Sequence, residues 1–132
     1  MIHAKLLEWE KRLTQLFNEV DDYLEDNYGD LYILHPARPE RGSTSNKSQD
    51  GLFNVGAAFS AGLGSEYGPG YVIEVRFATL ENVPEPVKAQ ISEEVVNMVK
   101  ERLPRFFPEN KLHVARDGNI YKIYGDLKLG NV

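Results

Sequence analysis

Two neighbouring segments of the chain, residues 52–61 and 71–79, alternate apolar side chains with small or polar ones at a period of two. The apolar face of the first carries Phe53, Val55, Ala57, Phe59 and Ala61, and that of the second carries Tyr71, Ile73, Val75, Phe77 and Thr79. Such alternation is typical of strands that bury one face. Because the connector at residues 62–70 contains four glycines, we expect an antiparallel pair at the centre of the fold.

Residues 2–26 gather their apolar side chains into a stripe about 120° wide when they are wound as an α-helix. The stripe consists of Ile2, Leu6, Trp9, Leu13, Leu16, Phe17, Val20, Tyr23 and Leu24. A stripe of this breadth is suited to covering a sheet. Most of its members also keep the 4-3 spacing of a coiled-coil seam, so self-association through this helix is an alternative.

A second helix is expected over residues 86–103, because Pro86 is a favourable first helical residue and Pro104 should end the helix. Its apolar side chains cover more than half of the circumference and are Val87, Ala89, Ile91, Val95, Val96, Met98, Val99 and Leu103. A stripe this broad predicts burial against more than a sheet, either against the first helix or against a second subunit. The surplus apolar surface of the two helices therefore predicts a homodimer.

A C-terminal hairpin is predicted by Asp117-Gly118, which is typical of a two-residue turn. Centring the turn on these residues pairs Val114 with Tyr121, Leu112 with Ile123, and His113 with Lys122. The first two pairs place four apolar side chains on one face of the hairpin, which supports this register.

Residues 31–34 (Leu-Tyr-Ile-Leu) predict one more short strand. The predicted fold is thus a single α+β domain over residues 1–132, with the order α-β-β-β-α-β-β and a mostly antiparallel five-stranded sheet covered by two helices. This order of elements is similar to that of dimeric bacterial secretion chaperones, a likeness of fold that carries no residue roles.

Composition narrows the function further. The chain has no cysteine, which excludes disulfides and thiolate chemistry and suits a cytoplasmic protein. Its net charge of −5 disfavours binding to a polyphosphate backbone, so we expect no nucleic-acid partner. No apolar run has the ~18 residues of a membrane span, and we expect no membrane association. The three histidines, His3, His35 and His113, lack ligand spacing, so neither a metal nor a cofactor is expected.

Four carboxylates crowd the end of the first helix: Asp21, Asp22, Glu25 and Asp26. They oppose the helix dipole, which disfavours negative charge at a C-terminus. The calcium-loop pattern is absent, so we interpret them mainly as solvated surface charge, with a cation or a basic partner as the alternative.

The segment at residues 35–50 is long, rich in proline, serine and charge, and almost free of apolar residues, so it predicts a long mobile loop. Its cations, Arg38, Arg41 and Lys47, stand beside hydroxyls and free backbone amides, a combination that suits phosphate or carboxylate. Loops of this length usually either carry a function or are disordered. We expect both arginines to be exposed and to contribute little to folding.

The connector at residues 62–70 approximates a dinucleotide-binding glycine motif but is followed by a strand where that motif needs a helix. We therefore interpret it as a flexible hairpin loop. If it met the 35–50 loop, then Gly64, Ser65, Glu66 and Tyr67 would border the cations there. Glu66 or His35 would then be available for proton transfer.

No catalytic constellation emerges from these patterns. The sequence therefore favours a small non-enzymatic binding or assembly module that acts through a protein partner or as a homodimer. The alternative is a small-molecule site, or an enzyme, that holds a phosphate- or carboxylate-bearing ligand between Arg38–Lys47 and Gly62–Gly70.

Overall fold

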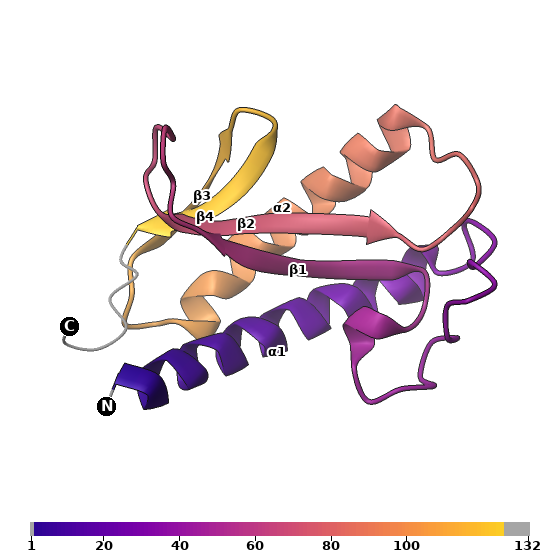
Figure 1. Cartoon of the computed structure of the whole chain (residues 1–132), viewed down its shortest axis with the longest axis horizontal. Coiled ribbons are helices and arrows are strands. Elements are labelled where there is room, and N and C mark those ends of the chain that lie inside the picture. The colour runs from indigo at the N-terminus through magenta and orange to yellow at the C-terminus, as the bar shows by residue number, and fades with distance from the viewer. Residues whose placement is uncertain (1, 126–132) are drawn as a thin grey trace.

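The computed structural model describes the backbone of residues 2–125 and the side chains from Ala4 onward, so the predicted roles of Ile2 and His3 lie outside the described residues. Its elements are α1 (Ile2–Tyr28), η1 (Lys47–Gln49), β1 (Phe53–Ser60), β2 (Gly70–Phe77), α2 (Glu85–Phe106), β3 (Leu112–Asp117) and β4 (Ile120–Gly125). The strands form one antiparallel sheet in the order β1-β2-β4-β3, and the two helices pack together on one of its faces (Figure 1). The chain is therefore a single α+β domain, as the sequence predicted.

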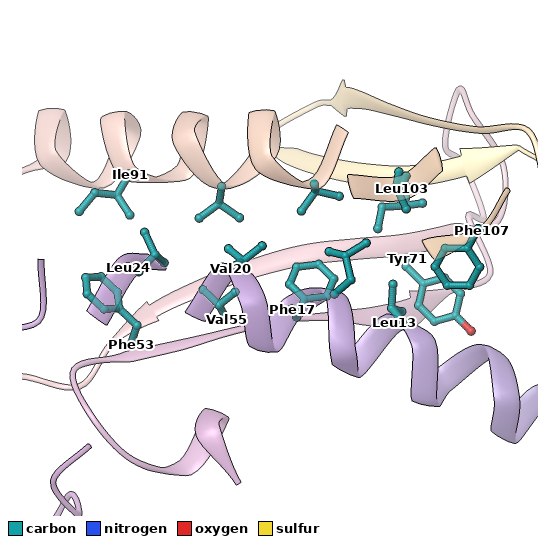
Figure 2. Packing of buried hydrophobic residues seen from close by; sticks show 14 of the residues in the cluster. Leu13, Phe17, Val20, Leu24, Phe53, Val55, Tyr71, Ile91, Leu103 and Phe107 are labelled. Atoms are coloured by element: carbon teal, nitrogen blue, oxygen red, sulfur yellow. The ribbon is translucent and has the colours of Figure 1, made fainter. Parts of the chain in front are cut away.

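The apolar stripe of α1 is buried within its own chain. Leu16, Val20 and Leu24 are fully inaccessible, and Trp9 is 5% exposed. Figure 2 shows the stripe lying between α2 on one side and β1 and β2 on the other. The stripe thus covers a sheet and a helix together, which leaves little of it for a coiled-coil seam.

The broad stripe of α2 is likewise accommodated inside the chain, through Ile91, Val95, Val96, Val99 and Leu103. Two hydroxyls tie the helices together at the surface, since Tyr23 and Tyr28 both donate to the carboxylate of Glu94. The bond to Glu94 raises the pKa of Tyr28 to about 12. The dimer prediction rested on surplus apolar surface of the two helices, and most of this surface is buried within the single chain.

The predicted end of the second helix at Pro104 is wrong, because α2 continues to Phe106. A proline in the last turn removes one helical donor, which is a moderate cost so close to the end. Leu103 and Phe107 on either side are 4% and 1% exposed, and the amide of Phe107 donates to the carbonyl of Leu103. Burial of these two side chains carries the helical path past the proline.

Among the residues that the structure describes, the sheet has four strands, so the five-stranded prediction is wrong. Residues 31–34 run beside the end of β2 without forming a strand, and the observed order is α-β-β-α-β-β. Three hydrogen bonds hold this segment there: the amide of His35 donates to the carbonyl of Ala78, the hydroxyl of Thr79 donates to the carbonyl of Ile33, and the amide of Ile33 donates to the carboxylate of Glu81. Ile33 is 73% exposed, so the segment has no buried face to fix a ladder.

The C-terminal hairpin is present, but its register differs from the predicted one. Val114 pairs with Ile123, and His113 pairs with Tyr124, because the turn is centred on Gly118-Asn119. Gly118 has a φ of +67°, which suits the first central position of a hairpin turn. The shift leaves each residue on its predicted face, and it places Lys122 opposite Ala115 and Val72 on the face away from the helices.

No helix within residues 2–125 is both long and apolar enough to cross a membrane.

Trp9 provides a test of this core. Its ring contacts Phe107 and Tyr71, with ring centroids 4.4 and 5.9 Å apart. Replacing Trp9 with Ala should lower the free energy of unfolding by about 3–5 kcal/mol, as truncation of a buried aromatic does. Denaturant titration would measure this loss, and Leu7→Ala is the control because Leu7 is 66% exposed. Equal losses in the two variants would contradict the assigned packing.

Candidate functional site

The segment at residues 35–51 folds against the C-terminal half of α1, and Arg38 holds it in place. The Arg38 guanidinium donates to the backbone carbonyls of Gly51, Ser48, Asp50 and Phe53 at 2.8–3.2 Å. The Arg38 side chain is thus half-buried and bonded to backbone carbonyls, so the expectation that Arg38 is exposed is wrong. These contacts also oppose the mobility predicted for this loop.

The other two cations of the loop bind the acidic end of α1. Arg41 Nη1 lies 2.7 Å from a carboxylate oxygen of Asp26, and Lys47 Nζ lies 2.8 Å from one of Asp22. The bond to Asp26 raises the pKa of Arg41, and the bond to Asp22 raises that of Lys47. The basic partner of these two surface carboxylates is therefore the chain itself, and the cations are engaged before any ligand arrives.

The remaining two carboxylates of the cluster are buried, which corrects their interpretation as solvated charge. Glu25 is 7% exposed and accepts hydrogen bonds from the amides of Leu52 (3.2 Å) and Phe53 (2.8 Å). Gly51 is required beside it, because a Cβ at that position would lie 2.4 Å from a carboxylate oxygen of Glu25. The buried carboxylate thus fixes the start of β1 to the end of α1.

Asp21 differs from its neighbours, because its Oδ2 is buried without a hydrogen-bond partner. The residue is only 4% exposed. Burial, with the nearby charges of Glu25, Asp22 and Asp50, raises the pKa of Asp21 to about 7. Asp50, also buried, is by contrast satisfied by the amides of Gly42 and Thr44 and by the Thr44 hydroxyl.

These acids do not make a metal centre. Among residues 4–125, no three His, Asp or Glu side chains lie where they could share a metal ion. His35 is used locally, since its Nδ1 accepts a hydrogen bond from the amide of Ala37 at 3.0 Å.

The glycine-rich connector folds back over the outer face of the β3–β4 hairpin and covers Lys122. The ammonium group of Lys122 donates to Ser65 Oγ (2.8 Å) and the carbonyl of Gly68 (2.9 Å), and it lies 3.1 Å from a carboxylate oxygen of Asp117. Ser65 Oγ in turn donates to that carboxylate, and the bonds to Ser65 and Lys122 lower the pKa of Asp117. Because the ammonium is enclosed by three acceptors, it fastens the connector and is unsuited to act as a base for Ser65.

The other predicted connector residues have separate surroundings. The ring of Tyr67 stacks on Tyr124 with centroids 4.6 Å apart, whereas Gly64 and Glu66 are exposed. Gly64 has a φ of +76° with open space around it, so it serves the turn. No residue of the connector contributes to the cavities of 260–450 Å³ that lie beside β1, β2 and α2.

The two predicted groups of site residues do not meet. His35, Arg38, Arg41 and Lys47 lie at the end of the β1–β2 pair where Phe53 faces Phe77, and the connector leaves from the other end, where Ser60 faces Gly70 (Figure 1). The strands between them are eight residues long. A single cleft with loop cations and Glu66 is therefore not formed.

Sequence reasoning missed Lys122, Asp117, Glu25 and Asp21 as organising residues. Lys122 offered a signal, because it interrupts an otherwise apolar strand and a buried lysine needs several acceptors. Of the two acids of α1, only Asp21 carried a weaker signal, because it lies about 40° beyond the edge of the apolar stripe when residues are placed 100° apart around the helix. Glu25 lies about 80° beyond that edge, so its position in the sequence does not distinguish it from the exposed acids.

A groove of about 440 Å³ lies between α1 and the outer edge of β1. Glu10, Thr14 and Asn18 from α1 line it, with Asn46 at the N-cap of η1, Ser48 within η1, and the small residues at the middle of β1. A Cβ at Gly56 would meet no atom within 4 Å, so the groove is open there. Within residues 2–125, β1 pairs with β2 alone, and no strand of this range lies on its other edge along the groove.

Comparison with known proteins places the chain among its relatives. The model of a family described as "Uncharacterised protein" matches residues 4–125. An "Uncharacterized protein" of Borreliella burgdorferi (strain ATCC 35210 / DSM 4680 / CIP 102532 / B31) is 38% identical over 122 residues, which is 92% of this chain and 95% of the relative. The chain belongs to this family. No solved structure is significantly similar to it.

The two loop arginines give a matched test. Arg38→Ala should lower the free energy of unfolding by about 2–4 kcal/mol, because buried carbonyls lose a charged donor. Arg41→Ala should cost less than about 1 kcal/mol, since its ion pairs are exposed. Denaturant titration of both variants measures the difference, and equal small losses would contradict the structural role of Arg38.

Proposed function

We propose that the protein is a non-enzymatic assembly module that forms a homodimer by pairing β1 of one copy with β1 of a second copy. The observation that carries this proposal is the free edge of β1 beside an open groove. An unpaired edge presents a row of backbone donors and acceptors, and another strand satisfies them by adding to the sheet.

The residues of β1 favour such pairing. Strands that stay alone at an edge usually carry lysine, proline or a bulge that prevents another strand from docking. The β1 sequence, Phe-Asn-Val-Gly-Ala-Ala-Phe-Ser, contains none of the charged residues or prolines that would do this. Its middle is Gly56-Ala-Ala58, whose small side chains let a second backbone approach closely.

The strand is also complementary to itself in one antiparallel register. A two-fold axis through Ala57 sets Phe59 of one copy opposite Val55 of the other, on the face toward the helices. The same register sets Asn54 opposite Ser60 on the other face, an amide next to a hydroxyl. Apolar residues meet apolar ones and polar residues meet polar ones, as cross-strand pairing requires.

Exposed apolar side chains support this surface. Phe59 is 61% exposed at the end of β1, although it belongs to the face that packs on the helices. Leu7, which is 66% exposed, shares the groove side of α1 with Thr14 when residues are placed 100° apart around the helix. A second copy lying along β1 removes apolar surface of this kind from water.

The rival reading, a small-molecule site or an enzyme, has less support. Arg38, Arg41 and Lys47 are all bound to groups of the chain itself, and the two loops lie at opposite ends of β1. A cytoplasmic location remains part of the proposal on the strength of the cysteine-free composition.

Blocking the edge tests the dimer. At micromolar concentration, analytical ultracentrifugation should find the wild type at twice the chain mass of 15.0 kDa. The Gly56→Lys protein should sediment as a monomer, at about half that mass. In this register position 56 faces Ala58 of the second copy, so the two lysines would lie diagonally across the axis, and a charged edge resists pairing. Space at Gly56 and its ordinary φ let the monomer fold unchanged.

Ala89→Lys is the control, because it adds the same charge on an exposed position of α2. It should sediment as the wild type does. A wild type that sediments only as a monomer, or a Gly56→Lys protein that remains dimeric with an unchanged circular dichroism spectrum, would refute the proposal.

A further inference from the structure

Asp21 is the one buried acid of the α1 cluster whose charge has no compensation. Its Oδ2 is inaccessible and unbonded, while Glu25 and Asp50 accept hydrogen bonds from backbone amides. An ionised carboxylate without hydrogen bonds in a buried position is costly. The site therefore favours a neutral, protonated Asp21.

The groups that face Asp21 come from two segments. Asp22 and Glu25 belong to α1, and Lys47 and Asp50 belong to the segment that covers it. Lys47 is the only cation among them, and its ammonium is bound to Asp22. Ionisation of Asp21 would thus place another negative charge among three carboxylates.

The covering segment also borders the groove beside β1. Asn46 and Ser48, on either side of Lys47, line the groove, and Asp50 anchors the amides of Gly42 and Thr44. A change in the charge of Asp21 therefore acts on the same short segment that forms one wall of the groove.

We propose that Asp21 is a proton-operated latch. With a neutral Asp21, residues 42–50 pack closely on α1 and narrow the groove, and its ionisation loosens this segment and widens the groove along β1. Any effect of this widening on the pairing of two β1 strands rests on the proposed function, but the opening of residues 42–50 does not.

The sign of the effect follows from linkage. In the closed state the pKa of Asp21 is raised to about 7, while in an open, solvated state it returns to its ordinary value of 3.8. The stabilisation of the closed state is therefore complete below the lower value, declines as pH rises, and is lost once pH passes 7. Between the two values, the opening equilibrium should rise by up to about tenfold per pH unit.

Two NMR measurements on the whole chain test this. The ¹³C carboxyl resonance of Asp21 should titrate near pH 7. The amides of Gly42 and Thr44 should lose protection from hydrogen exchange, corrected for intrinsic rates, by up to about tenfold per pH unit between pH 5 and pH 7. In Asp21→Asn, which keeps the shape without the charge, the protection should stay constant over this range.

Asp26→Asn is the control, since it removes one carboxylate from an exposed position of the same helix and should retain the pH dependence. Titration of Asp21 near pH 4, or the same pH dependence in wild type and Asp21→Asn, would overturn the latch. Repeating the exchange measurement in Gly56→Lys separates the two proposals. The pH dependence of exchange in this variant tests the latch alone, whereas the sedimentation of the wild type tests the dimer alone.

Discussion

The backbone of residues 50–53 is held between a buried carboxylate and a guanidinium, and the placement of β1 depends on this arrangement. Glu25 accepts the amides of Leu52 and Phe53, and Arg38 donates to the carbonyls of Asp50, Gly51 and Phe53. Each charged group satisfies backbone that would otherwise be buried without partners. Since Phe53 is the first residue of β1 and is fully buried, the same contacts set the register of the strand against α1.

A second charged group fixes the opposite end of the hairpin. Lys122 binds Ser65 and Gly68 on the connector, and Gly70 is needed beside it because a Cβ there would lie 2.8 Å from the lysine stem. Polar contacts thus fasten β1 and β2 at both ends, where the chain turns. The middle of β1 has no such contact on its outer edge, so the fold leaves open the stretch with the smallest side chains.

The sequence predicted those parts of the fold that depend on periodicity. The stripe on α1, the β1–β2 pair and the faces of the C-terminal hairpin all follow from which side chains avoid water. It failed where two local arrangements were close in energy. Asp117-Gly118 and Gly118-Asn119 both suit a tight turn, and residues 31–34 are apolar enough for a strand but lack a surface to bury against. The sequence also failed to predict the burial of Arg38, Glu25 and Lys122. A charged side chain is expected at the surface unless the buried backbone groups that it binds are known.

Asp21 shows where local and global requirements conflict. Two of the four acids at the end of α1 are neutralised by Arg41 and Lys47, and a third, Glu25, organises the start of β1. An asparagine or an alanine at position 21 would avoid burying a second acid beside Glu25, so the carboxyl of Asp21 costs stability at neutral pH without any compensating bond. Uncompensated costs of this kind are expected where a site responds to a signal rather than where it only holds the fold together. The protonation of Asp21 is therefore the property of this structure that packing alone does not explain.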